Sequence, residues 1–539
     1  MLSAVIFYTL LFVLLVLAPV GLILVVLLFL EQERRLWQRE APAAKYLGAR
    51  LARFPFLARL ARRFPRAWAL LSHRFRTDDP WGLAATFAVC ASVFGGWVFR
   101  GVMRDVLGND PLVTLDLRLH NSMLIFRTAN MTSFMLVLTG LGSGTVLSLL
   151  CYGIVLFALA RNRPRIAATF VLALVSSSLL SALIKGLIAL PRPRDSLVRE
   201  TSTSFPSEYL LSATVVYGLL AAIVLGSRAR RSLRALGATA LLLVIVGVGL
   251  SQLYLGVHWP SDLLGSLTLA LMLLPPLLFF LHYRAPLSFI DSFHLPWRPD
   301  VARVVGAGMI ALAFGAAVVL ADQQELLPMG PQPARHAINS AELSTSMPAN
   351  LPGQSEDLIG GKMEPISLVL VGSRQDILTG FSRAGWARAD APTPMRVMQE
   401  GLATLWNRPD FSGPATPAFF LDQPQDLTFE KADTANPSIR RRHHTRLWQT
   451  PYCLAPICRA VWVATASYDV GVEFSKRSHL PTHRIDPAID HERELIITDL
   501  IGMGARQLSL ITVLPPLHGM NPAGDVFFSD GHAAVIALP

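Results

Sequence analysis

The first 321 residues are dominated by long apolar runs that are separated by short, mostly basic segments. Residues 4–30 contain no charged side chain, and later apolar spans cover 81–99, 130–160, 166–189, 208–226, 235–251, 263–281 and 304–321. About 20 consecutive apolar residues suffice for a helix to cross the hydrocarbon core of a bilayer. The pattern therefore predicts a polytopic α-helical membrane protein that begins with an N-terminal transmembrane helix.

Basic side chains lie on alternate sides of these spans. They are concentrated in residues 31–80, 161–165, 228–234 and 284–298. Because cytoplasmic loops carry an excess of Lys and Arg, these segments are predicted to be cytoplasmic. The loops 190–207 and 252–262 and everything after residue 321 are then extracytoplasmic, which in a bacterium is the periplasmic side of the inner membrane.

The composition agrees with a membrane location and argues against a nucleic-acid partner. The chain is 52% hydrophobic and 16% charged, whereas soluble domains carry about 25% charged residues. The net charge of +11 is unevenly distributed, because residues 1–321 carry +16 and residues 322–539 carry −5. The excess lies in predicted cytoplasmic loops and orients the spans. Within the basic segment 31–80, residues 53–64 suit either a helix that lies on the anionic leaflet or a loop that only fixes the membrane topology.

Three polar clusters occur near span ends, where ionisable side chains are rare and are therefore candidates for function. Lys185 and Arg192 are about two helical turns apart, and two cations that face one point suit a phosphate. Ser207 is placed to cap the next helix, whose free N–H groups can receive an anion. His258 and Asp262 are four residues apart, so Asp262 can hold one imidazole nitrogen while the other faces a substrate. Clusters at one membrane face do not favour a transporter, whose site lies near the midplane.

In this order, the clusters resemble the three-part signature of the type-2 phosphatidic acid phosphatase and vanadium haloperoxidase superfamily over residues 85–285. The matching segments are Lys185-x6-Arg192-Pro193, Pro206-Ser207 and Ser251-x6-His258-x3-Asp262. The resemblance implies a six-helix core with an outward-facing phosphatase site that uses no metal or cofactor, since vanadate-dependent halogen chemistry belongs to soluble relatives. It further implies that Lys185, Arg192, Ser207 and Ser251 bind phosphate, that His258 forms a phosphohistidine and that Asp262 orients it.

Three positions depart from that signature. Glu208 and Tyr209 stand where the family has Gly and His, and Gln252 stands where it has Arg. Tyr209 then occupies the position of the catalytic acid, although a phenol, with an ordinary pKa near 10 against about 6.5 for His, donates a proton poorly at neutral pH. A leaving phosphate needs less protonation than an alkoxide, so an active site is expected to prefer a lipid diphosphate, such as a polyprenyl carrier, to phosphatidic acid. The alternative is a degenerate phosphatase-like scaffold or secretion accessory that acts through its outer domain.

After residue 321 the chain becomes more polar. Residues 322–364 are predicted to be a linker without secondary structure, and residues 365–539 a soluble α+β domain with a mainly antiparallel sheet. Within the domain, Ser373 and Asp376 predict a capping box, and Asp530-Gly531 predicts a hairpin turn. Strands are expected at 366–372, 426–430, 440–448, 458–474 and 508–513. The predicted organisation is thus an N-terminal helix and basic loop (1–80), a phosphatase-like membrane domain (81–285), a final transmembrane helix (286–321), the linker (322–364) and the outer domain (365–539).

The outer domain resembles, over residues 365–515, the C-terminal domain named after LssY, a component linked to type I secretion. The segments that carry the resemblance are 368–373, 384–390, 440–448 and 482–493. In that family the domain follows a phosphatase-like membrane core. The resemblance therefore implies the architecture of this chain, with an envelope or secretion partner that binds through residues 365–539.

Three features of the outer domain leave alternatives open. A zinc site and the start of a helix over 487–501 compete for one segment, which contains His479, His483, Asp486, Asp490, His491 and Glu492. The basic segment 440–446 with Trp448 suits anionic headgroups or, more simply, a strand face in water. Cys453 and Cys458 can form a disulfide in an oxidising compartment or remain thiols.

Overall fold

The computed structural model describes residues 63–74, 81–108, 111–282, 298–327, 335–390, 412–433, 441–474 and 481–539, together with single positions between 391 and 411. These residues form two compact units. One contains the described residues of 63–110 and 128–327, and the other contains 111–127 and 335–539. The predicted span 4–30, the segment 53–62 and the candidate ligand His479 lie outside the described residues.

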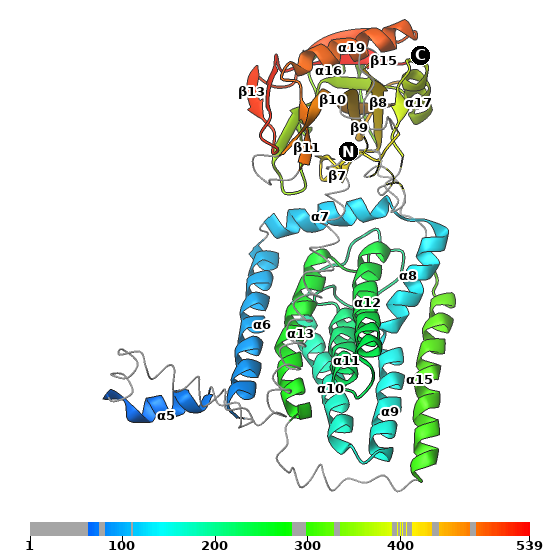
Figure 1. The fold of residues 1–539 in the computed structure, drawn as a ribbon. Coiled ribbons are helices and arrows are strands. Elements are labelled where there is room, and N and C mark those ends of the chain that lie inside the picture. The colour runs from blue at the N-terminus through cyan, green and yellow to red at the C-terminus, as the bar shows by residue number, and fades with distance from the viewer. Residues whose placement is uncertain are drawn as a thin grey trace. The chain divides into compact units, whose positions relative to one another are not determined.

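The first unit is built from helices (Figure 1). They are α5 (Pro65–Arg74), α6 (Leu83–Gly108), α8 (Ala129–Leu141), α9 (Gly144–Ala160), α10 (Pro164–Leu187), α11 (Glu208–Leu225), α12 (Arg231–Leu255), α13 (Pro260–His282) and α15 (Pro299–Asp322). Within the described residues, α6, α10, α11, α12, α13 and α15 are long and apolar enough to cross a membrane, and the pair α8 and α9, bent by 47°, is a seventh candidate. This confirms a polytopic α-helical membrane protein, with the expected span 130–160 divided into two helices.

The bend between α8 and α9 has a local cause. Gly142 ends α8, and the side chain of Ser143 caps α9 by accepting a hydrogen bond from the amide of Val146. A Cβ atom at Gly142 would lie 2.7 Å from the side chain of Val248. Small residues let helices approach closely in membranes. The break therefore lets α12, which carries Ser251 one turn after Val248, pack closely against the α8–α9 junction.

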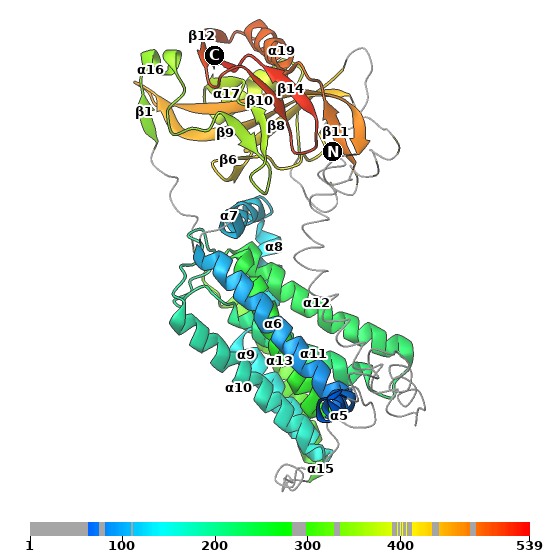
Figure 2. The same cartoon turned by 90° about the vertical axis from the view of Figure 1, so that its left-hand side faces the viewer.

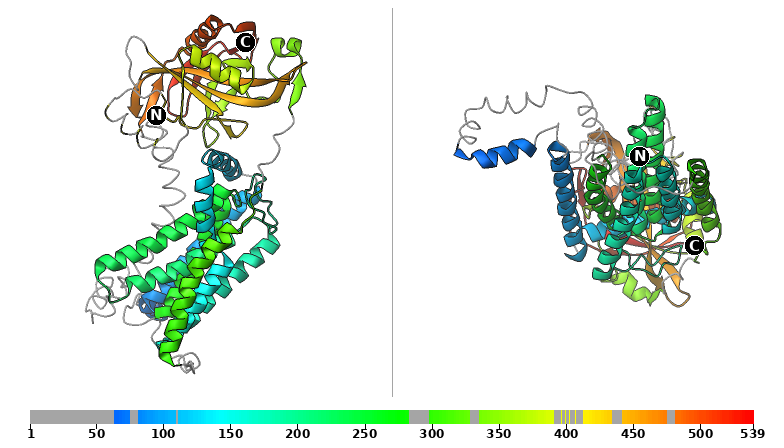
Figure 3. Two further views of the ribbon diagram at one scale, coloured as in Figure 1. Left: turned by 90° about the vertical axis from the view of Figure 1, so that its right-hand side faces the viewer. Right: turned by 90° about the horizontal axis from the view of Figure 1, so that it is seen from below.

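Helix α11 is the most deeply buried of the candidate spans, and α10, α12 and α13 pack against it. The long helices run alongside one another in the different views (Figures 1 and 3). After Glu208, α11 carries no ionisable group other than tyrosine. A helix that is apolar all round is suited to burial within the unit.

The loops at one end of this unit are tied together by backbone hydrogen bonds. The amide of Leu197, in the loop after α10, donates to the carbonyl of Leu255 at 2.9 Å, and the amide of Leu327, after α15, donates to the carbonyl of Leu197 at 2.8 Å. The ends of α10, α12 and α15 therefore lie at the same face of the helical unit. This is the face at which the sequence places the candidate site.

The second unit is an α+β domain (Figure 2). Its largest sheet has the strand order β12-β15-β4-β10-β9-β8-β5, and every neighbouring pair on this path is antiparallel except β15 with β4. The strands are β1 (His336–Ile338), β2 (Gln354–Glu356), β3 (Lys362–Pro365), β4 (Leu368–Val371), β5 (Ala387–Arg388), β6 (Phe419–Phe420), β7 (Gln423–Pro424), β8 (Leu427–Ala432), β9 (Arg442–Leu454), β10 (Arg459–Phe474), β11 (Pro481–Ile485), β12 (Arg506–Thr512), β13 (Leu517–Met520), β14 (Val526–Ser529) and β15 (His532–Ala537). Its helices are α7 (Pro111–Leu124), α16 (Ser340–Thr345), α17 (Arg374–Arg383) and α19 (Ile489–Gly502).

Helices α17 and α19 pack on one face of the large sheet. Phe381 of α17 and Leu500 of α19 join Trp462 of β10 in a buried apolar cluster. The predicted capping box is present at the start of α17, because Ser373 and Asp376 each accept a hydrogen bond from the other's amide. The predicted α+β class with a mainly antiparallel sheet is confirmed.

Two predictions for this unit are wrong. The expected linker 322–364 contains β1, α16, β2 and most of β3, and its isolated apolar residues Ile338, Leu343 and Leu351 are buried in the domain core. Asp530-Gly531 does not close a hairpin, because β14 pairs with β13 whereas β15 pairs with β12 and β4. Local turn chemistry could not reveal that the chain passes there from one sheet to another.

Side-chain partners bear on the competing interpretations of the outer domain. Helix α19 begins at Ile489, close to the expected start, and the carboxylates of Asp490 and Glu492 have separate partners, namely the Asp530 amide at 2.7 Å and His443 at 2.9 Å. Among the described residues no group of three potential metal ligands occurs, so the zinc alternative finds no support there. In the basic segment, Arg441 is exposed whereas Arg442 and His444 are buried, so the expected solvated strand face is only partly present.

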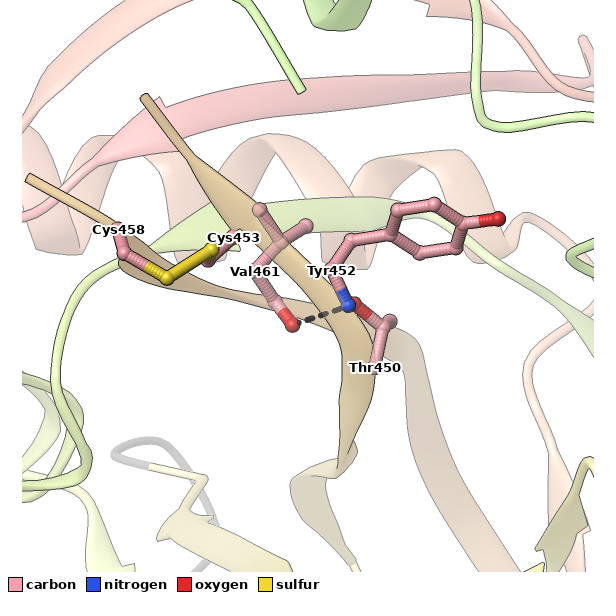
Figure 4. The surroundings of a disulfide bond; sticks show 5 residues. All are labelled: Thr450, Tyr452, Cys453, Cys458 and Val461. Carbon is pink, nitrogen blue, oxygen red and sulfur yellow. Dashed lines mark hydrogen bonds between the residues drawn. A yellow bond between two sulfur atoms is a disulfide. The ribbon is translucent and has the colours of Figure 1, made fainter. Parts of the chain in front are cut away.

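Cys453 and Cys458 form a disulfide across the hairpin that joins β9 to β10 (Figure 4). The Thr450 hydroxyl donates to the carbonyl of Val461 at 2.8 Å on the same hairpin. Cys90 and Cys151 are free thiols. The disulfide alternative is therefore the one that the structure adopts.

Helix α7 belongs to the second unit although it lies between α6 and α8 in the sequence. The Arg118 side chain, 4% exposed, donates to the carboxylates of Glu356 and Asp422, and its guanidinium lies 5.5 Å from the ring centre of Phe419. Asn121 adds a hydrogen bond to the carbonyl of Asp422 at 2.9 Å. Arg118 thus anchors α7 to the small sheet formed by β2, β3, β6 and β7.

Candidate active site

The end of α10, the loop 188–207 and the turn between α12 and α13 meet at one face of the helical unit. The turn begins where Gly256, with a φ of 71°, ends α12 in the left-handed conformation that glycine adopts readily. Pro260 then starts α13, a position that suits proline because its missing N–H would have no helical partner. These signals hold His258 in a short turn directly before Asp262.

His258 and Asp262 form the pair that their spacing predicts. The Nδ1 atom of His258 lies 3.1 Å from Oδ2 of Asp262, and both side chains are almost fully buried. The same oxygen accepts a hydrogen bond from the amide of Trp259 at 2.8 Å and another from the hydroxyl of Ser204. Because these donors fix the carboxylate, Asp262 holds the imidazole in one orientation.

Arg192 approaches the other side of the imidazole. Its Nη1 atom lies 3.2 Å from Nε2 of His258 and donates to the carbonyl of Val257. The Nε atom donates to the carbonyl of Ser202 at 2.7 Å, and Glu200 lies 4.0 Å from Nη2. An arginine can only donate, so Nε2 of His258 accepts and the proton of the neutral ring is on Nδ1.

Lys185 completes the cationic side of the cluster. Its Nζ atom donates to the hydroxyl of Ser202 at 3.2 Å, and Nη2 of Arg192 donates to the same hydroxyl at 2.9 Å. The two cations therefore converge on one oxygen, as the spacing of Lys185 and Arg192 predicts. This hydroxyl occupies the kind of position in which a phosphate oxygen would receive both donors.

Ser202 and Ser204 are site residues that sequence reasoning missed. Ser202 contacts both cations and Ser204 contacts Asp262, but neither belongs to the matched signature. Serine and threonine are common in loops, so these positions carried no distinguishing signal. Their clustering in residues 201–204, immediately before Pro206-Ser207, was the available hint.

The remaining predicted site residues are placed differently. Ser207 caps α11 as expected, and its hydroxyl accepts from the amide of Leu210. Tyr209 is the second residue of α11, and its hydroxyl forms no hydrogen bond with the residues that the structure describes. Ser251 and Gln252 both hydrogen-bond Thr139 of α8, at 2.6 Å and 3.1 Å. The structure therefore groups Lys185, Arg192, His258 and Asp262, while Ser251 and Gln252 are engaged with α8.

The electrostatics favour a neutral imidazole. Burial lowers the pKa of His258, and the positive charges of Arg192 and Lys185 lower it further, against the opposing hydrogen bond and charge of Asp262. A neutral His258 with its proton on Nδ1 keeps a lone pair on Nε2. The arrangement can therefore supply a nucleophile next to a cationic site for an oxyanion.

Two segments of the chain match known protein families. Residues 138–285, which include every predicted site residue, match the PAP2 superfamily. This segment is a PAP2 superfamily domain. Residues 348–533 match the family described as LssY C-terminus, so the chain joins a PAP2 domain to an LssY C-terminal domain, as the two resemblances predict.

One similar solved structure is the first transmembrane PAP2 type phosphatidylglycerolphosphate phosphatase from Bacillus subtilis. The alignment has 23% sequence identity, covers 35% of this chain and 93% of the phosphatase chain, and has a TM-score of 0.31. No curated protein matches the chain. With its PAP2 domain and its apolar helices, the chain is a multi-pass membrane protein of the lipid-phosphatase-like class.

Proposed function

We propose that this protein hydrolyses a lipid phosphate, and preferentially a lipid diphosphate, through a phosphohistidine at His258. The observation that carries the proposal is the orientation of the imidazole. Its Nδ1 atom faces Asp262 at 3.1 Å, and its Nε2 atom lies 3.2 Å from Arg192. The lone pair of the nucleophile and the cation that would receive the phosphate are therefore adjacent.

The proposed reaction has two steps. The Nε2 lone pair attacks phosphorus, the bond to the leaving oxygen breaks, and Arg192 and Lys185 stabilise the charge on the transferring group. Water then cleaves the phosphorus–nitrogen bond, which releases phosphate and restores His258. Tyr209 is a weak acid, so a leaving phosphate, which needs little protonation, is favoured over a leaving alkoxide.

Phosphate release by the purified full-length protein tests this proposal. The substrates are a polyprenyl diphosphate and phosphatidic acid, and the variants are His258→Ala and His282→Ala, whose side chain lies at the opposite end of α13. We expect His258→Ala to reduce release at least about 10³-fold, as loss of a nucleophile does, and His282→Ala to retain it. Equal or faster release from phosphatidic acid would contradict the diphosphate preference.

One observation favours the second candidate, a non-catalytic membrane scaffold. Ser251 and Gln252 are directed to Thr139, so the third signature segment contributes His258 and Asp262 but not these two side chains to the cationic cluster. If the wild type and His258→Ala release phosphate indistinguishably from both substrates, the scaffold function is favoured over the catalytic one.

We further propose that the site and the LssY C-terminal domain face the outside of a bacterial inner membrane. The support is the alternation of basic loops, together with the hydrogen bond between Leu197 and Leu327, which joins the site loop to the segment after α15. A reporter fused after Ala321 is expected to give an extracytoplasmic signal. A cytoplasmic signal would overturn the orientation without affecting the geometry of the site.

A further inference from the structure

The LssY C-terminal domain contains a cavity on the face of the large sheet opposite α17 and α19. Its volume is about 180 Å³. Charged side chains line it: Asp357, Glu364, Glu430, Arg442, Arg446 and Asp469. Sites for drug-sized ligands occupy roughly 300–1,000 Å³, so this cavity suits a ligand of only a few non-hydrogen atoms.

The cavity comes from an interrupted strand pattern. Along β9 and β10, Trp448, Val461 and Val463 of this sheet face belong to an apolar core cluster. Further along the same face the alternate positions become Arg442, His444 and Arg446 on β9, paired across the sheet with Asp469, Ser467 and Thr465 on β10. An apolar face would stabilise the fold without buried charge, so the change to charged side chains at these positions points to a ligand rather than to packing.

One part of the charged lining is paired within the protein. Arg442 donates to Glu430 at 2.7 Å and to Asp469 at 3.1 Å, and all three side chains are at most 5% exposed. His444 lies beside this group, with Nε2 2.8 Å from the hydroxyl of Ser467. Burial and the neighbouring arginines lower the pKa of His444 well below its ordinary value, so it adds no charge at neutral pH.

A second part of the lining is not satisfied. The Nη1 atom of Arg446 lies 3.8 Å from Oε2 of Glu364, which is too far for a hydrogen bond. Among the described residues, Nε of Arg446 donates to no acceptor and Oε2 of Glu364 accepts from no donor, although the two side chains are only 12% and 3% exposed. A guanidinium carries five donors and a carboxylate about four acceptor sites, so this pair, whose residues line the cavity, has unused hydrogen-bonding capacity.

The pair of Arg446 and Glu364 selects the ligand, because the Arg442 group is already paired. An anion alone would bind Arg446 but would be repelled by Glu364. A cation alone would bind Glu364 but would be repelled by Arg446. We propose that the LssY C-terminal domain binds a small zwitterion in this cavity, with its phosphate, phosphonate or carboxylate group on Arg446 and its ammonium group on Glu364.

Binding to the purified full-length protein tests this inference. The probes are 2-aminoethylphosphonate, whose carbon–phosphorus bond resists phosphatases, and its two halves, methylphosphonate and ethylamine. We expect the zwitterion to bind at least about 10-fold more tightly than either half, because charge-assisted hydrogen bonds form at both ends. β-Alanine, in which a carboxylate replaces the phosphonate, determines which oxyanion the site prefers. Equal affinity for the zwitterion and its halves would overturn the proposal.

Variants assign the binding to this cavity. Arg446→Gln is expected to lower the affinity for 2-aminoethylphosphonate about 10- to 100-fold. Arg441→Gln changes an exposed neighbouring arginine and is expected to leave that affinity unchanged. Glu364→Gln is expected to lower the affinity for the zwitterion but to raise the affinity for methylphosphonate. Misfolding cannot produce such a gain. Arg192→Gln, in the PAP2 domain, is expected to have no effect. Loss of binding in Arg192→Gln with retention in Arg446→Gln, or no change in Glu364→Gln, would overturn the assignment.

Discussion

Removing the Arg118 side chain is expected to release α7 from the LssY C-terminal domain. Arg118 is 4% exposed, and its acceptors Glu356 and Asp422 are 22% and 34% exposed. Breaking a buried ion pair costs about 3–5 kcal/mol, but partly exposed acceptors regain hydration, so we expect Arg118→Met to cost about 2–3 kcal/mol of docking free energy. At about 1.4 kcal/mol per factor of ten, the undocked state of α7 becomes roughly 30- to 100-fold more populated.

Hydrogen–deuterium exchange of the full-length protein measures this change directly. Peptides from Pro111–Leu124 should exchange roughly 30- to 100-fold faster in Arg118→Met, while peptides from the large sheet keep their wild-type rates. The control is Arg104→Met, because the Arg104 side chain is 81% exposed and, among the residues that the structure describes, pairs only with its neighbour Asp105. Unchanged exchange of α7, or an equal acceleration throughout the domain, would refute the role of Arg118 as a local anchor.

The same contact predicts an acid-dependent release of α7. Burial alone would raise the pKa of Glu356, but hydrogen bonds and charge from Lys362 and Arg118 outweigh it and lower that pKa. A carboxylate with a lowered pKa stabilises the docked state at neutral pH, and this contribution is lost as the pH falls below its ordinary range near 4.5. Exchange of α7, corrected for its intrinsic rate, should therefore rise in acid, and less so in Arg118→Met.

Three further predictions concern other parts of the chain. Asp262→Asn should lower the rate of phosphate release about 10²- to 10⁴-fold, because the imidazole loses its orienting charge, and kinetics that equal the wild type would argue against that role. Burial raises the pKa of Glu430 from 4.5 to about 7, so the unfolding free energy should fall by up to about 3 kcal/mol as the pH rises from 4.5 to 8. Denaturant titrations should show a flatter pH dependence for Glu430→Gln, and an unchanged one would contradict this. Cys458→Ser should destabilise the LssY C-terminal domain by about 2 kcal/mol, because the disulfide of Cys453 and Cys458 closes a short loop. Cys151→Ser, in α9, should not lower the melting temperature of that domain. Equal thermal shifts for the two variants would contradict the prediction.

Features that depend on local periodicity and spacing follow from the amino-acid sequence alone. Apolar runs predicted the membrane helices, and the i,i+4 spacing of His258 and Asp262 predicted their contact, because both follow from the geometry of one helix or turn. The capping box at Ser373 and Asp376 is local in the same sense. The strand alternation along β9 was visible too, although it did not show which face would be buried.

Long-range partners depend instead on how the whole chain folds. Arg118 meets Glu356 across 238 positions of the chain, and Ser204 meets Asp262 across 58, and no local pattern marks either pair. The same holds for Arg442, His444 and Arg446, which would suit a surface strand until other elements enclose them. The reason is physical: local sequence fixes which side chains share a face, whereas the path of the rest of the chain decides whether that face meets water, a core or a cavity.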